Sequence, residues 1–204
     1  ITCSNDYIES LWWILKKIWE KELLYQDYKV VPYCPRCGTS LSSHELALGY
    51  KDGVSDTSVY VKFKLLDEKS TYLLAWTTTP WTLPGNVALA VNPDADYVRV
   101  EIENETYIVA RLCLSILGQE LKEKRSFKGN ELLGKSYEPL YPYLKYDQKS
   151  HYVVPADFVS MEEGTGIVHT AVMYGEEDFQ LGKKYDLPRK HAVNEKGEFI
   201  ADIT

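Results

Sequence analysis

The sequence of 204 residues has no long apolar run, no repeat and no low-complexity linker, and its acidic residues outnumber its basic ones. No stretch approaches the ~20 apolar residues of a membrane-spanning helix, and the first residues lack the pattern of a signal peptide. These absences predict a cytoplasmic protein without a membrane partner. The hydrophobic share of 45% and the charged share of 26% are ordinary for a globular chain, and this length can bury a sizeable core.

Basic residues are too few for a protein that binds duplex nucleic acid along a groove. The 23 Lys and Arg against 30 Asp and Glu leave a net charge of -7, whereas a long groove that binds duplex nucleic acid needs a basic face. A pocket for one or two terminal nucleotides is still compatible with this charge. The chain opens on Ile1 rather than on methionine, and we expect it to be a segment of a longer protein.

Cysteines are also few. Four of them are too sparse for a small disulfide scaffold, which favours a reducing compartment. Only Cys34 and Cys37 lie close together, in a Cys-x-x-Cys turn that supplies half of a tetrahedral zinc site. His44 is a weaker candidate for a third ligand, because it stands in a loop-like stretch.

The first segment has the pattern of an amphipathic helix. Apolar residues recur at helical spacing from Ile8 to Leu23, with Asp6 as the expected N-cap and Glu9 as its capping-box partner. The tryptophans of this segment favour a core helix, and burial against a further domain is the alternative.

The rest of the chain is dominated by short strand signals. Many short strands with few helices predict an α+β fold, a β-barrel with peripheral helices. Residues 1–50 are expected to form a helical and Cys-x-x-Cys connector, and residues 51–204 the barrel domain. Strands are predicted at 60–65, 72–76, 87–91, 151–154 and 166–169, a hairpin at 97–110, helices at 111–122 and 176–185, and a final strand pair around 194–197.

Three threonines mark the most informative segment. Thr77, Thr78 and Thr79 leave a predicted strand and meet Pro80, which restricts Thr79 to extended backbone. Their hydroxyl and backbone groups can bind a small polar ligand. Taken alone, however, the pattern fits a solvated turn better than a binding site.

Two further segments carry candidate chemistry. Gly164 and Gly166 allow a close backbone approach just before His169, but neither a lone histidine nor a Gly-x-Gly is specific evidence. Asp178 is one of three acids in the first turn of a predicted helix, where the helix dipole alone explains acidic residues. The free N–H groups of that turn predict that Asp178 stays ionised.

Together these segments resemble one family, the class I aminoacyl-tRNA synthetases, in the editing domain of the isoleucine enzyme. The run Thr-Thr-Thr-Pro-Trp-Thr-Leu-Pro-Gly-Asn from Thr77 to Asn86 is similar to the first motif of that domain, and Gly-Thr-Gly-Ile-Val-His, with Asp178 nine residues after His169, is similar to the second. The valine and leucine relatives usually carry arginine where Thr79 stands. The segment Val172-Met173-Tyr174 departs from the family, which puts the shape of the pocket rim in question.

The resemblance implies a hydrolase that removes valine mischarged onto isoleucine tRNA, after the amino acid has been transferred to the tRNA. It leaves open whether the aminoacyl adenylate is also hydrolysed before that transfer. It implies that Asp178 binds the α-ammonium group, that His169 excludes isoleucine, and that Asn86 supports the threonine loop or the nucleotide. The implied catalytic residues are Asp178, Thr78 and His169, and the implied substrate-binding residues are Trp76, Thr77, Thr78, Thr79, Asn86, His169 and Asp178.

The resemblance also sets expectations for cofactors and partners. Editing itself needs no cofactor, and ATP belongs to a separate catalytic domain whose His-x-Gly-His and Lys-Met-Ser-Lys-Ser signatures do not occur here. A second Cys-x-x-Cys lies beyond this region in the family, so Cys34 and Cys37 form a structural zinc half-site expected to be empty in this segment. The expected partners of this monomer are the 3′ end of isoleucine tRNA and the catalytic domain of the same polypeptide. The alternatives are a tRNA 3′-end binding module without hydrolysis and, disfavoured by the single Cys pair, a zinc-ribbon interaction domain.

Overall fold

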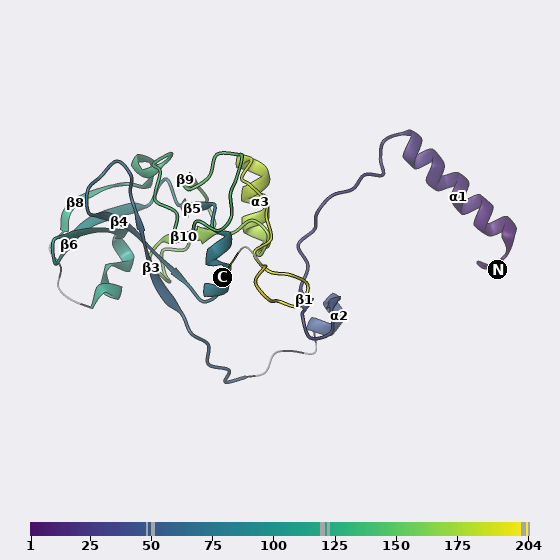
Figure 1. Cartoon of the computed structure of the whole chain (residues 1–204), viewed down its shortest axis with the longest axis horizontal. Coiled ribbons are helices and arrows are strands. Elements are labelled where there is room, and N and C mark those ends of the chain that lie inside the picture. Colours follow the sequence, from purple (N-terminus) through teal and green to yellow (C-terminus); the bar gives the residue numbers. More distant parts are fainter. Residues whose placement is uncertain (48, 50–51, 119–120, 122, 201–202, 204) are drawn as a thin grey trace.

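The computed structural model describes the chain apart from residues 48, 50–51, 119–120, 122, 201–202 and 204, so the predicted boundary between residues 50 and 51 lies outside the described residues. Two sheets share one core, and the first helix stands apart from them (Figure 1). The α-helices are α1 (Asn5–Glu20), α2 (Ser43–Leu46) and α3 (Glu176–Tyr185), and the 3-10 helices are η1 (Pro80–Gly85), η2 (Arg111–Leu117) and η3 (Gly129–Leu132). The strands are β1 (Tyr33–Cys34), β2 (Thr39–Ser40), β3 (Val59–Lys64), β4 (Thr71–Thr77), β5 (Ala88–Val91), β6 (Asp96–Ile102), β7 (Glu105–Ala110), β8 (Glu123–Lys128), β9 (Tyr152–Pro155) and β10 (Ile167–Thr170).

The larger sheet has the strand order β3-β4-β7-β6-β8 and is antiparallel except where β4 pairs with β7. The predicted hairpin is confirmed as β6 and β7. Its two turn residues, Glu103 and Asn104, both have positive φ angles, 50° and 69°, as a type I′ turn requires to match the twist of the strands.

The smaller sheet has the order β10-β5-β9 and packs against the larger one. Leu89 and Val91 of β5 face the core shared by the two sheets, while Ala88 and Ala90 pack into a second cluster with Phe179 of α3. A strand covered on both faces is apolar throughout, which explains the unbroken apolar run of β5. The α+β class is therefore confirmed, and closure of the two sheets into a barrel stays a prediction.

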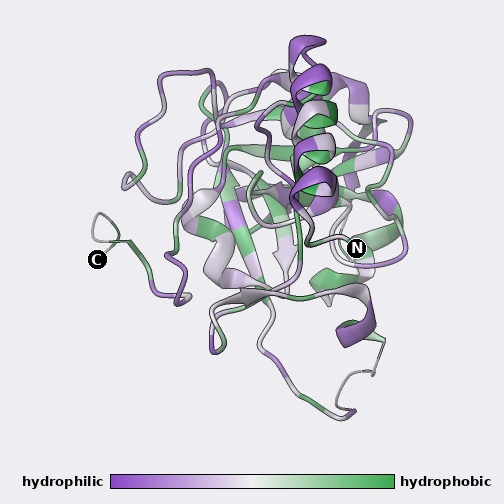
Figure 2. Ribbon diagram, turned by 90° about the vertical axis from the view of Figure 1, so that its right-hand side faces the viewer, coloured by the Kyte–Doolittle hydropathy of each residue, from purple (hydrophilic) through white to green (hydrophobic). Residues whose placement is uncertain are grey.

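Helix α1 is the element that departs most from expectation. Trp12, Trp13 and Trp19 are 66%, 61% and 64% exposed, and α1 buries none of its residues. Figure 2 shows hydrophobic and hydrophilic stretches along this helix, which stands in front of the sheets in that view. The prediction of a core helix is wrong for the described chain, because no other described element covers its apolar face. The N-cap is Ser4, without a side-chain cap bond, rather than Asp6.

Two other predicted elements differ from the structure. The helix predicted at 111–122 is the short 3-10 helix η2, which ends at the left-handed Gly118 (φ 71°), and its predicted end at 122 lies outside the described residues. The final strand pair is reduced to a single bridge between Val193 and Phe199. The Asn194 side chain accepts the N–H groups of residues 196 and 198 and closes a tight turn there, which leaves little length for a ladder. No described helix has both the length and the apolar character that crossing a membrane requires.

Gly166 precedes β10 and determines how closely that strand approaches β7. Its φ is +71°, and a Cβ there would lie 2.2 Å from the Cβ of Ala110. We expect Gly166→Ala to lower the free energy of unfolding by about 2–4 kcal/mol, from backbone strain and overpacking together, as measured by urea denaturation. Gly118→Ala is the matched control, because Gly118 has the same φ with nothing within 4 Å of the added Cβ. Equal losses in the two variants would show that the contact with Ala110 contributes nothing.

Candidate active site

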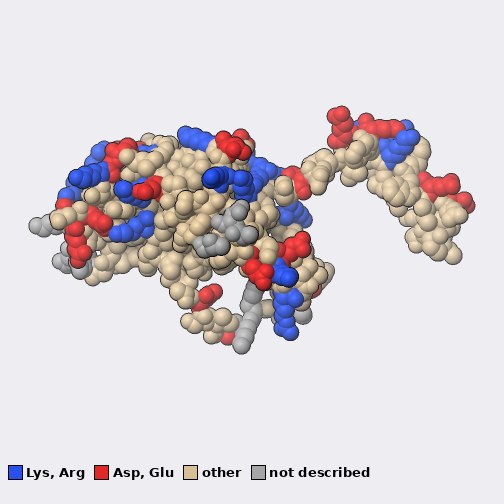
Figure 3. Space-filling view, viewed as in Figure 1, with Lys and Arg blue, Asp and Glu red and all other residues tan. Residues whose placement is uncertain are grey.

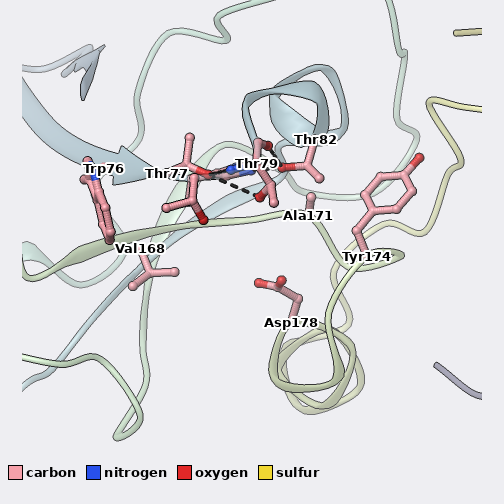
Figure 4. Close-up of a pocket in the computed structure, with 10 residues that line it drawn as sticks. Trp76, Thr77, Thr79, Thr82, Val168, Ala171, Tyr174 and Asp178 are labelled. Carbon is pink, nitrogen blue, oxygen red and sulfur yellow. Dashed lines mark hydrogen bonds between the residues drawn. The ribbon is translucent and has the colours of Figure 1, made fainter. Parts of the chain in front are cut away.

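The ends of β4 and β10, the 3-10 helix η1 and the first turn of α3 enclose a pocket of about 210 Å³. Helix η1 follows β4 and leads into β5, the neighbour of β10, and the N–H of Val87 donates to the carbonyl of Thr170 (3.0 Å). This pairing places the threonine run and His169 at one pocket. The short 171–175 turn then brings α3 to the same pocket, where Asp178 lies opposite Thr77 and Thr79 (Figure 4). The pocket is lined by Trp76, Thr77, Thr78, Thr79, Thr82, Val168, His169, Ala171, Tyr174 and Asp178.

The threonine run forms a hydrogen-bonded turn. The buried Thr77 Oγ1 accepts the N–H of Thr79 (3.1 Å), and the Thr79 carbonyl accepts both the N–H (3.0 Å) and the hydroxyl (2.8 Å) of Thr82. Thr79 therefore has a ψ of 65° as the N-cap of η1, and the predicted extended backbone is wrong because this turn outweighs the effect of Pro80. Thr78 and Thr79 are exposed, so their hydroxyl groups are accessible to a ligand.

His169 forms a buried wall of the pocket, with 7% of its surface exposed. Its Nε2 lies 2.7 Å from the Thr82 hydroxyl and its Nδ1 lies 3.0 Å from the Asn86 amide nitrogen. Burial lowers the pKa of His169 to about 4, so the ring is neutral at pH 7. With both ring nitrogens bonded, the imidazole has a fixed orientation.

Asp178 faces the threonine turn from the opposite side of the pocket (Figure 4). Burial and the nearby Glu177 raise the pKa of its carboxyl to about 7, although the backbone of Ala171 lowers it in part. The prediction that Asp178 is held ionised is therefore wrong, because desolvation outweighs the hydrogen bonds. A Cβ at the helix N-cap, Gly175, would lie 2.6 Å from the Asp178 carboxylate, so a side chain at position 175 would displace this carboxylate.

Of the predicted catalytic and substrate-binding residues, all but Asn86 line the pocket. Asn86 is only 3% exposed and lies behind His169, so it can support the pocket wall but not contact a nucleotide. Sequence reasoning missed Thr82, although Thr82 belongs to the first motif, because its role comes from the 3-10 turn. It also missed Val168, the residue before His169, and Ala171, the first residue of the 171–175 turn.

Tyr174 lies on the pocket rim, in the segment 172–174 whose sequence departs from the family pattern. Its ring packs edge-on against Trp81 with the ring centroids 5.0 Å apart. Its hydroxyl accepts the N–H groups of Ala192 and Val193. These contacts tie the rim to the 192–193 segment, which is distant in the sequence.

Cys34 and Cys37 flank the turn between β1 and β2, with the Gly38 N–H donating to the Cys34 carbonyl (2.8 Å). Two thiols in such a turn suit the first half of a tetrahedral zinc site. Among the described residues, no group of three His, Cys, Asp or Glu side chains is placed to bind a metal ion. His44 lies on α2 and does not complete a set of three ligands with this pair.

Comparisons with known proteins agree with this architecture. The chain is 54% identical to the isoleucine–tRNA ligase of Clostridium acetobutylicum over all of its length and 47% identical to that of Thermus thermophilus over 98%. It covers 20% of each of those proteins, so it spans about one fifth of the length of the relatives it matches.

Two solved structures share the fold over about two thirds of the chain. The structure of GlLeuRS-CP1 is 22% identical, with a TM-score of 0.54, and covers 62% of this chain and 59% of its own. The cytosolic leucyl-tRNA synthetase editing domain of P. knowlesi is 18% identical, with a TM-score of 0.51, and covers 67% of each chain. The α+β fold is thus that of these editing domains.

The model of the family described as tRNA synthetases class I (I, L, M and V) matches residues 1–189. The chain therefore belongs to the class I tRNA synthetase family.

Proposed function

We propose that this chain is an editing region that hydrolyses the ester between valine and the 3′ end of isoleucine tRNA. The observation that carries this proposal is the placement of Asp178 opposite the threonine turn, across a pocket of about 210 Å³. A carboxylate there offers a charge-assisted partner for the α-ammonium group of an aminoacyl ester. The exposed hydroxyls of Thr78 and Thr79 supply partners for the ester and the terminal ribose.

The proposed reaction is a direct hydrolysis. A water oxygen attacks the ester carbonyl carbon, the bond from that carbon to the ribose oxygen breaks, and the ribose oxygen takes up a proton. The products are free valine and tRNA with an unesterified terminal ribose. An aminoacyl ester is reactive enough that positioning the water and stabilising the oxyanion can accelerate this step without a dedicated base. His169 has no free ring nitrogen, so we assign it to the pocket wall rather than to proton transfer.

The fixed imidazole of His169 also gives the pocket a size limit. Binding alone separates isoleucine from valine poorly, because one methylene is worth only about 1–3 kcal/mol. In the isoleucine enzyme a second, hydrolytic site supplies the missing discrimination. We assign His169 to the wall that stops the longer side chain. Trp76, which lies at the opposite end of the pocket from Tyr174 (Figure 4), offers an aromatic face to the terminal adenine.

The proposed tRNA partner is consistent with the charge distribution. Figure 3 shows acidic and basic residues interspersed over this face rather than gathered in one basic field. Because the net charge of the chain is also -7, we expect it to contact only the 3′ end of the tRNA, while a linked catalytic domain supplies the remaining affinity. The exposed tryptophans of α1 favour such a contact with a further domain.

The experiment that tests the function is deacylation of isoleucine tRNA charged with valine or with isoleucine by this chain. We expect release of valine well above the uncatalysed rate and little release of isoleucine. The alternative is a module that binds the tRNA 3′ end without hydrolysis. The support for this alternative is the uncovered apolar face of α1, which needs a partner outside the described residues. Tight binding of uncharged tRNA without deacylation of the valyl ester would establish the alternative.

We also propose that Cys34 and Cys37 are half of a structural zinc site completed elsewhere in the polypeptide. The purified chain is expected to contain well below one equivalent of zinc, because two thiolates leave two tetrahedral positions without protein ligands. Elemental analysis measures this, with a Cys34→Ser variant as the control for nonspecific binding. One equivalent of zinc that is lost in the variant would contradict the half-site.

A further inference from the structure

A chain of hydrogen bonds leads from the pocket wall into the core. His169, Asn86 and Tyr137 are consecutive members of it, and Tyr137, 1% exposed, lies outside the pocket. The Tyr137 hydroxyl is 2.7 Å from the Asn86 amide oxygen, and the Asn86 amide nitrogen is 3.0 Å from Nδ1 of His169. These three side chains come from segments up to 83 residues apart.

The direction of every hydrogen bond in this chain follows from one carbonyl. The carbonyl of Ala88 can only accept, so the group 2.9 Å from it is the amide nitrogen of Asn86. The same nitrogen donates to Nδ1 of His169, so Nδ1 carries no proton. The amide oxygen of Asn86 then faces Tyr137, whose hydroxyl must donate.

The remaining bonds reach the threonine turn. A neutral His169 with an unprotonated Nδ1 carries its proton on Nε2, so Nε2 donates to the Thr82 hydroxyl. The Thr82 hydrogen is then directed to the Thr79 carbonyl, 2.8 Å away. The opposite histidine tautomer would place an Nδ1–H group against the Asn86 N–H group.

The Tyr137 hydroxyl is well placed to fix this arrangement. Among the described residues it is the one donor to the Asn86 amide oxygen. The Tyr137 ring is held edge-on by Phe63 and His151, with centroids 5.2 and 5.8 Å away. Without that donor, a buried amide oxygen would lose its partner, and the amide would have reason to turn.

We propose that Tyr137 is a positioning residue that fixes the proton of His169 on Nε2 and so sets the shape of the pocket wall that separates valyl from isoleucyl esters. The selectivity part of this proposal rests on the proposed function. The hydrogen-bond order does not depend on it.

The test compares Tyr137→Phe with Tyr97→Phe. Both tyrosines are buried and both lose one donated hydrogen bond. The Tyr97 hydroxyl donates to the Gly166 carbonyl (2.6 Å), also accepts the N–H of Asn92 (3.1 Å), and is outside the chain of bonds to His169. Nitrogen-15 NMR of the histidine rings reports which nitrogen of His169 carries the proton, with the signal assigned by His169→Ala. Deacylation of the two esters reports kcat and KM.

We expect a single Nε2–H signal for His169 in the parent chain and in Tyr97→Phe, and a mixture of tautomers in Tyr137→Phe. The ratio of kcat/KM for valyl over isoleucyl ester should fall about tenfold in Tyr137→Phe, the factor that a lost hydrogen bond typically represents, and should change little in Tyr97→Phe.

A proton on Nδ1 of His169 in the parent chain would overturn the proposed bond order, even if Tyr137→Phe fails to fold. Unchanged tautomer and selectivity in a folded Tyr137→Phe variant would show that Tyr137 does not position His169. A parent chain that hydrolyses neither ester would refute the proposed function and the selectivity part with it, while the NMR result would still decide the bond order.

Discussion

Asp178→Asn is expected to lower kcat/KM for valyl-tRNA by about 100-fold, because the substitution removes a charge-assisted partner of the substrate ammonium group. Asparagine has nearly the same shape as aspartate, so the contacts of the first turn of α3 can persist. A filter assay of valine release over time measures the rate. Glu177→Gln is the matched control at about pH 8, above the pKa of Asp178, because Glu177 is the exposed neighbour in the same turn and lies outside the pocket lining.

The same substitution is expected to stabilise the folded chain at high pH. Burial raises the pKa of Asp178 from its ordinary 3.8 to about 7, so over this range the folded state binds a proton that the unfolded state has released. The free energy of unfolding therefore falls as the pH rises from about 4 to about 7. Asparagine carries no such penalty, and Asp178→Asn should be about 2 kcal/mol more stable than the parent at about pH 8 and equal to it near pH 4. This figure is discounted because the carboxyl is partly exposed.

The pH dependence of the parent chain follows from the same group. Only the ionised carboxylate binds an ammonium group, so kcat/KM should rise with pH through about 7 and fall again once the substrate ammonium loses its proton. Removing the charge of Glu177, which helps to raise the pKa of Asp178, should move the rising limb of kcat/KM to lower pH in Glu177→Gln.

If Asp178→Asn deacylates valyl-tRNA at the parental rate, the proposed ammonium-binding role of Asp178 is wrong.

His169→Ala is expected to make correctly charged isoleucyl-tRNA a substrate, with its hydrolysis raised about 10- to 100-fold. The imidazole is fixed by Thr82 and Asn86, so in the parent chain it cannot move aside for one more methylene, a group worth about 1–3 kcal/mol. Alanine removes the ring from the pocket wall and leaves the space open. The variant also removes one hydrogen bond from Thr82 and one from Asn86, which keep their bonds to the carbonyls of Thr79 and Ala88. These two losses should lower the free energy of unfolding by about 1–3 kcal/mol.

Isoleucine release from isoleucyl-tRNA is the deciding measurement, and thermal unfolding shows whether the variant is folded at the assay temperature. His44→Ala, on the exposed helix α2, is the control for loss of a histidine outside the pocket. If isoleucyl-tRNA is as resistant to hydrolysis by a folded His169→Ala chain as by the parent, His169 does not exclude the isoleucine side chain.

Local sequence patterns were sufficient for most of the regular elements. The β6–β7 hairpin and helix α3 follow from alternation, turn residues and an N-terminal turn rich in acids, all of which act between neighbouring residues. The three candidate segments were each ambiguous, and only their joint order pointed to one pocket. Helix α1 also follows from periodicity, but its exposure does not, because an amphipathic pattern does not specify what covers the apolar face.

The chemistry of the pocket was decided by the tertiary structure. The raised pKa of Asp178 comes from its burial at the pocket and from the nearby Glu177, and the neutral state of His169 comes from its burial beside η1. Thr82 and Tyr137 gain their roles from partners 87 and 51 residues away in the sequence. The residue types were visible from the start, but desolvation and hydrogen bonding depend on neighbours in space, and those neighbours exist only once the two sheets and α3 have packed together.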